Sequence, residues 1–130
     1  MTALARGNGA GGALFEMSGE IPNNGTWAED IYFSEAGAPL DISGLDWKLT
    51  FRSDPLNTSA DLTLSTSDGT LEVVEDDDGF NRVLRIAVAA GELSSYRDDY
   101  IADLASQDVA GAVTLYAHGI VTFTQNPVVF

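Results

Sequence analysis

The residue types that perform acid–base or metal chemistry are scarce in this chain. There is one histidine, His118, and there is no cysteine. General acid–base catalysis needs a partner held beside the histidine, and no serine stands in a G-x-S-x-G turn that would present a nucleophile. A zinc site would have to rely on carboxylates, which is an unusual ligand set. No glycine-rich phosphate-binding motif is present. The sequence therefore predicts no enzyme activity and no cofactor.

The densest acidic run, residues 75–78, stands directly before Gly79. Several neighbouring carboxylates are what a hard cation such as Ca²⁺ prefers. The spacing does not fit the D-x-[DN]-x-[DN]-G calcium loop, because Val74 occupies the position of the first acid. Two interpretations stay open: a solvated turn, which is the usual role of a charge run, and a cation site.

The overall composition excludes several classes of partner. The chain has 130 residues, with 20 acidic residues against 6 Lys plus Arg and a formal net charge of −14. Nucleic acids and anionic membranes attract basic surfaces, so neither is an expected partner. The N-terminus has no apolar run of signal-peptide length, and no stretch approaches the roughly 18 apolar residues of a membrane span. The charge either keeps the protein soluble or forms an acidic face for a basic partner.

Period-two alternation of apolar and polar residues dominates the chain from Trp27 onward, and it is clearest where Leu45, Trp47, Leu49 and Phe51 alternate with polar residues. Turn residues separate the segments, and no window has the periodicity of an amphipathic helix. The pattern predicts an antiparallel β-sandwich of about seven strands. Gly119 is expected to mark a bulge in the last strand. The predicted strands lie at residues 27–33, 45–51, 62–65, 71–74, 83–88, 100–104 and 112–124.

The two ends of the chain differ from this central part. Residues 1–25 are rich in glycine, which favours a flexible arm, and residues 26–130 form the predicted domain with an apolar C-terminal tail. Apolar side chains in such segments usually dock on something. Those of the arm have two alternatives, the domain's own surface and a neighbouring subunit. The predicted partner-binding residues are Leu14, Phe15, Met17, Ile21, Val128, Val129 and Phe130.

Two stretches together resemble a known group of proteins. The first is the G-x-P-x-D-(L/I)-(S/T)-G connector at residues 37–44, which runs into the strand of Trp47; the second combines residues 100–104 with residues 118–123. This order resembles the small β-sandwich modules of tailed-bacteriophage virion proteins, such as the N-terminal domains of baseplate and tail-fibre proteins. The resemblance covers residues 27–124.

What the resemblance implies is an Ig-like sandwich used in virion assembly, present in several copies or as a homo-oligomer. The protein is then expected to be a non-enzymatic component of a tail, baseplate, fibre adaptor or capsid decoration, assembled in the host cytoplasm. It would bind other virion proteins through its termini and sheet edges. The alternative is a carbohydrate- or cell-surface-binding module, for which Trp27, Trp47 and Tyr116 would need to form an exposed platform.

Overall fold

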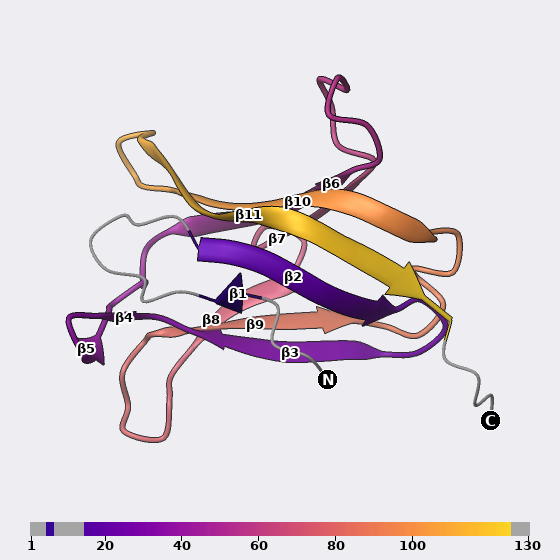
Figure 1. Cartoon of the computed structure of the whole chain (residues 1–130). Helices are drawn as coiled ribbons and strands as arrows, with labels where there is room; N and C mark the ends of the chain where they lie inside the picture. Colours follow the sequence, from indigo (N-terminus) through magenta and orange to yellow (C-terminus); the bar gives the residue numbers. More distant parts are fainter. Residues whose placement is uncertain (1–4, 7–14, 126–130) are drawn as a thin grey trace.

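The computed structural model describes residues 5–6 and 15–125, and within them every regular element is a β-strand. The large sheet has six strands in the order β1-β2-β11-β10-β6-β7 (Figure 1). Every pairing in it is antiparallel except that of β2 with β11, which is parallel. Its strands are β1 (Ala5–Arg6), β2 (Phe15–Pro22), β11 (Val113–Thr124), β10 (Asp98–Gln107), β6 (Asp46–Arg52) and β7 (Leu62–Ser65).

A smaller antiparallel sheet covers one face of the large one (Figure 1). Its order is β3-β9-β8, and a separate two-stranded ribbon pairs β4 with β5. The all-β fold is therefore consistent with a β-sandwich, with more strands than the sequence predicts. The strands of the small sheet are β3 (Trp27–Tyr32), β9 (Val83–Val88) and β8 (Leu71–Val74), and those of the ribbon are β4 (Ser34–Glu35) and β5 (Ala38–Pro39).

Alternation decides which side chains of each strand enter the core. In β6, Trp47, Leu49 and Phe51 are fully buried, whereas Asp46 and Lys48 are exposed on the opposite face. Successive side chains of a strand point to opposite faces, so each strand contributes one apolar row and one polar row. The apolar rows of the two sheets meet in one core.

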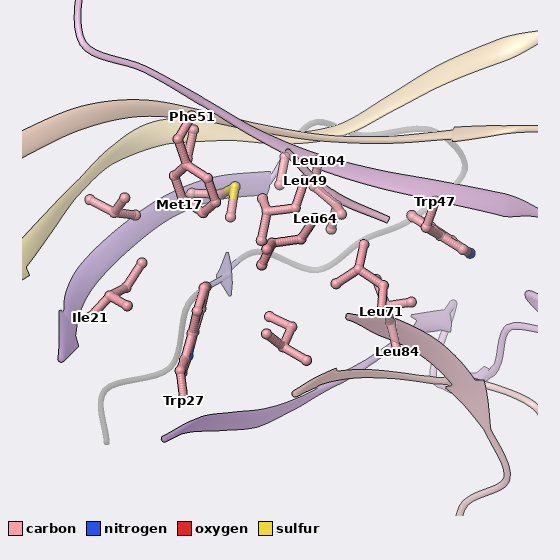
Figure 2. Packing of buried hydrophobic residues seen from close by; sticks show 14 of the residues in the cluster. Met17, Ile21, Trp27, Trp47, Leu49, Phe51, Leu64, Leu71, Leu84 and Leu104 are labelled. Carbon is pink, nitrogen blue, oxygen red and sulfur yellow. The ribbon is translucent and has the colours of Figure 1, made fainter. Parts of the chain in front are cut away.

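Aromatic and long aliphatic side chains fill that core (Figure 2). Trp27 of the small sheet meets Phe51 of the large sheet edge to face, with ring centroids 6.2 Å apart. This geometry places the positive edge of one ring on the negative face of the other, which adds to the gain from burial. Because these contacts join the two sheets, the sheets stabilise each other.

The N-terminal region departs from the predicted flexible arm, because residues 15–22 form β2. Its Met17 and Ile21 side chains are each only 1% exposed and point into the core toward Trp27 (Figure 2). Of the two alternatives for the apolar side chains of the arm, these two residues take the first and pack inside their own domain. Gly19, which argues against a strand in the sequence, lies within β2 with a φ of 135° that glycine tolerates.

Gly119 allows β2 to pack closely against β11, and it does not mark a bulge. Gly119 pairs with Met17, and a Cβ atom on Gly119 would overlap the main chain of Met17. The irregularity lies earlier, where Leu104 pairs with Ala117 and Ala105 pairs with Leu115. Tyr116 is thus the extra residue in β11, and its ring packs at the core edge against Trp47, with centroids 5.0 Å apart. The extra residue at Tyr116 explains why the buried side of β11 changes from one set of alternate residues to the other. The sequence pattern predicts this change at Gly119, three residues too late.

Candidate protein-binding site

The turn between β10 and β11 is a five-residue loop, residues 108–112, held by one aspartate. Asp108 Oδ1 accepts hydrogen bonds from the N–H groups of Ala110, at 3.0 Å, and Ala112, at 2.9 Å. The main chain adds a bond from Asp108 N–H to the Ala112 carbonyl and one from Gly111 N–H to the Asp108 carbonyl, each 3.0 Å long. Gly111 has a φ of 91°, a conformation that side chains with a Cβ atom disfavour. The loop is therefore closely hydrogen-bonded.

Large apolar side chains lie in the open on this loop and on the strand that follows it. Val109 is 98% exposed, Val113 68% and Leu115 44%. Val113 and Leu115 lie opposite Gln107 and Ala105 on the face of the large sheet that points away from the core. We refer to Val109, Val113 and Leu115 as the apolar patch.

The turn between β8 and β9 has the same hydrogen bonds. Asp76 Oδ1 accepts from the N–H groups of Asp78 and Phe80, both at 2.9 Å. Asp76 N–H bonds to the Phe80 carbonyl at 2.9 Å, and Gly79 N–H bonds to the Asp76 carbonyl at 3.1 Å. Gly79 has a φ of 86°. Both loops project from the same end of the molecule, one from each sheet (Figure 1).

Comparing the two matching loops shows which loop positions require a particular residue for folding and which do not. Both need the aspartate at the first position and the glycine at the fourth, because these residues make the bonds and supply the positive φ. The second and third positions carry Asp77 and Asp78 in one loop and Val109 and Ala110 in the other. Since the same loop forms with two aspartates at these positions, turn chemistry does not account for an almost fully exposed valine at position 109.

A shallow hollow adjoins the apolar patch on the large sheet. Its volume is ≈ 150 Å³, which suits a single side chain of a partner. Val113 forms its apolar side, and Lys48 supplies a positive charge. The residues around it are Asp46, Lys48, Ala105, Ser106, Gln107 and Val113.

His118 lies further along the same face, within a hydrogen-bonded group of charged side chains. Its Nδ1 lies 2.5 Å from Asp103 Oδ1, and Arg52 donates from Nη2 to Asp103 Oδ2 at 3.2 Å. Asp103 is thereby shared between two cationic or potentially cationic groups. Asp103 of β10 therefore links Arg52 of β6 with His118 of β11 across three neighbouring strands.

The acidic run holds a loop together. Besides its bonds to Asp78 and Phe80, Asp76 accepts a hydrogen bond from Arg82 Nε to Oδ2 at 2.6 Å. The Phe80 N–H, followed by the Arg82 guanidinium, keeps the pKa of the Asp76 carboxyl below its ordinary value, although burial acts in the opposite direction. Across residues 5–6 and 15–125, no group of three or more His, Asp or Glu side chains is arranged to hold a metal ion.

The predicted partner-binding residues fall into three groups. Met17 and Ile21 are core residues, so their side chains are not available on the surface. Phe15 begins β2, where it pairs with Ala117. Outside the described residues lie Leu14, Val128, Val129 and Phe130.

The aromatic platform of the alternative function does not form from the residues expected to make it. Trp27 and Trp47 are both fully buried, and their indole Nε1 atoms have no hydrogen-bond partner among the residues that the structure describes. Tyr116 is partly buried against Phe33 and Trp47. Neither tryptophan can present an open ring face to a sugar.

The apolar patch is a surface that the sequence did not predict. A signal for it exists, because the five-residue pattern D-x-x-G-x occurs at residues 41–45, 76–80 and 108–112. Comparing the copies at residues 76–80 and 108–112 draws attention to Val109. Alternation alone could not have revealed this surface, because it places Val113 and Leu115 in the buried row of β11 together with Ala117. The extra residue at Tyr116 turns these two side chains to the opposite face.

No known protein family matches the chain, and no curated protein is significantly similar to it. Within the described ranges there is no helix long and apolar enough to span a membrane.

Proposed function

We propose that this chain is a non-enzymatic structural protein of a phage-like particle, and that it binds neighbouring virion proteins through the apolar patch on the β10–β11 hairpin. The observation that carries the proposal is the exposure of Val109 on a loop whose folding does not require an apolar side chain there. The Ig-like arrangement and the location on a virion follow from the sequence resemblance and form part of the proposal.

Energetics support binding at this patch. Fully burying one valine or leucine side chain is worth about 1.5–3 kcal/mol. Burying the exposed parts of Val109, Val113 and Leu115 therefore favours a contact, and these side chains leave apolar surface in water when the protein is alone. The hydrogen bonds of Asp108 and the fixed φ of Gly111 hold the loop in shape, so little conformational entropy is lost when it docks.

The charge of the chain favours a partner other than a free second copy in solution. A formal net charge of −14 makes two copies repel one another. In a larger particle, each copy can bind a different protein and need not contact another copy directly. Several copies can then be present despite their mutual repulsion. Leu14, Phe15 and the tail residues Val128, Val129 and Phe130 remain proposed secondary contacts.

Purified particles provide the test. Tailed particles from cells that encode this chain would be separated on a density gradient, and their proteins identified by mass spectrometry. We expect the chain to be present at a constant ratio to the other structural proteins. Val109→Asp should remove it from the particles while the free protein stays folded.

A matched control places the same charge on another exposed apolar residue. Leu56 is 86% exposed in the loop between β6 and β7, away from the apolar patch. Leu56→Asp should therefore leave incorporation into particles unchanged.

Two results would overturn the proposal. One is the absence of the chain from particles that are otherwise complete. The other is normal incorporation of the Val109→Asp variant, which would separate the apolar patch from any assembly role.

A further inference from the structure

A groove runs beside β7, the outermost strand of the large sheet, away from the apolar patch. Its volume is ≈ 450 Å³. One wall is β7, and the other is the end of β9 with the turn that follows it. The residues around it are Leu62, Thr63, Leu64, Asp68, Gly69, Thr70, Ala87, Val88, Ala89, Glu92 and Leu93.

The main chain of β7 offers hydrogen-bonding groups to this groove at Thr63. Thr66 N–H bonds to the Trp47 carbonyl of β6, whereas Ser65 N–H points the other way and bonds to Thr70 Oγ1. Main-chain groups of an antiparallel strand alternate between its two neighbours. Thr63 therefore has the same direction as Ser65, so its N–H and carbonyl point away from β6 and toward the groove. These are the groups to which an added strand bonds.

The groove combines apolar and acidic side chains. Leu62 provides its partly exposed apolar wall above the buried Leu64 and Leu93, and Asp68 and Glu92 provide two carboxylates. Neither lysine nor arginine occurs among the described residues that line it. The Thr70 hydroxyl and N–H both donate to Asp68, and they lower the pKa of its carboxyl, so Asp68 is ionised at neutral pH.

We propose that this groove binds an extended segment of another protein as an added strand on β7, with a lysine or arginine flanked by apolar side chains. In an extended segment, alternate side chains point to opposite sides. One set would contact the apolar wall at Leu62, and the basic residue would approach Asp68 and Glu92. The groove does not depend on the apolar patch, so this inference stands or falls separately from the proposed function.

A second copy of the chain fits the groove less well. The chain has only 6 Lys plus Arg against 20 acidic residues, and its net charge repels another copy. Nucleic acid is disfavoured by the same carboxylates, which would face phosphate groups. A basic, extended protein segment matches both the edge and the charge.

The test uses the full-length ¹⁵N-labelled protein and a synthetic peptide, acetyl-Ser-Val-Lys-Val-Arg-Val-Ser-amide. NMR titration should move the amide signals of residues 62–70 and 87–93 and leave the other acidic turns, such as residues 41–43 and 76–80, unchanged. A peptide with the same side chains but N-methylated at alternate residues should bind more weakly, because it cannot pair with Thr63.

Variants sharpen the test. Thr63→Pro removes the N–H that faces the groove and should weaken peptide binding about five-fold, the equivalent of about 1 kcal/mol for one hydrogen bond. Thr63→Val keeps the N–H and serves as its control, with thermal unfolding used to verify that both variants fold. Glu92→Lys should also weaken binding, whereas Asp77→Lys makes the same charge change on a distant loop and should not.

Three outcomes would overturn the inference. Equal binding of the N-methylated peptide, or equal signal changes at every acidic turn, would show only charge attraction. No signal change at millimolar peptide would exclude the site. Concentration-dependent changes at residues 62–70 without any peptide would assign the groove to a second copy of the chain instead.

Discussion

The β8–β9 and β10–β11 loops share one set of hydrogen bonds. They differ in the residues that do not take part in those bonds through their side chains. Asp76 and Asp108 each accept two main-chain N–H bonds, and Gly79 and Gly111 each have a φ near the same positive value. Between these residues one loop is acidic and the other is apolar. The comparison teaches that local folding specifies the first and fourth positions and leaves the second and third to other requirements.

The same comparison explains part of the charge. Besides Asp76 and Asp108, three more aspartates accept a hydrogen bond from the N–H two residues ahead. Aspartate stabilises turns in this way because its carboxylate replaces a main-chain acceptor. The residues in this second group are Asp41, Asp54 and Asp68. Part of the acidic excess therefore arises from how the chain turns between its strands, without reference to a basic partner.

Exchanging the two middle residues between the loops should give the largest effect. We expect Val109→Asp with Ala110→Asp to change the free energy of unfolding by less than about 0.5 kcal/mol, because the turn keeps its bonds. Association with particles should fall at least about tenfold, since burying one valine is worth about 1.5–3 kcal/mol. Urea unfolding and a co-sedimentation assay measure the two quantities.

The reciprocal exchange, Asp77→Val with Asp78→Ala, is the control for this prediction. It should leave particle association unchanged, since the small sheet carries the altered loop. If Val109→Asp with Ala110→Asp lost more stability than the reciprocal exchange, folding of the β10–β11 loop would depend on its apolar residues. That result would contradict the conclusion that folding does not specify the second and third positions.

Removing the aspartate from each loop should separate their stabilities. Asp108→Ala loses two hydrogen bonds to a charged acceptor, and we expect a cost of about 1.5–3 kcal/mol in the free energy of unfolding. Asp76→Ala should cost more, because Asp76 also pairs with Arg82 at 2.6 Å. Equal losses in urea unfolding would show that Arg82 adds nothing to the loop.

Replacing the glycine of each loop should instead give matched losses. Gly79→Ala and Gly111→Ala both place a Cβ atom at a positive φ, and a cost of about 1–2 kcal/mol is expected for each. Neither site is crowded by the described residues, since the nearest atom to a new Cβ at Gly111 is Gln107 Nε2 at 3.9 Å and none lies within 4 Å at Gly79. Different losses in thermal unfolding would mean that the two loops differ in backbone strain.

The pH dependence of the unfolding free energy should show a smaller effect, which arises from Asp76 in the β8–β9 loop. The pKa of Asp76 is lowered in the folded protein, so the unfolded chain takes up a proton first as the pH falls. The stabilisation from Asp76 is therefore complete above its ordinary pKa of 3.8 and is lost as the pH drops through the lowered pKa. Asp76→Asn should flatten the dependence of unfolding free energy on pH between about 5 and 2. An unchanged slope would contradict this assignment.

Much of the fold could be predicted from period-two alternation. The predicted strand at residues 45–51 corresponds to β6, because Trp47, Leu49 and Phe51 face a core on one side only. Strand β2 could not be predicted in the same way, although Met17 and Ile21 also share one face, because the glycines around them suggest flexibility. Its parallel partner β11 lies far along the chain, and local patterns carry no information about such pairing.

The candidate site was much harder to predict. Nothing in the types of Val109 or Val113 distinguishes an exposed valine from a buried one. The direction of Val113 depends on the extra residue at Tyr116, which is set by how that ring packs on Trp47. Only the repeated D-x-x-G-x pattern could have pointed to the loop.

The parallel pairing of β2 with β11 has a consequence for how the protein is made. Strand β2 leaves the ribosome long before β11, so Met17 and Ile21 stay without their final neighbours until residues 113–124 have also been synthesised. Contacts between distant parts of a sequence also slow folding, since a long loop must close before they form. The large sheet is then completed late, and Gly119 leaves the space in which β2 and β11 meet.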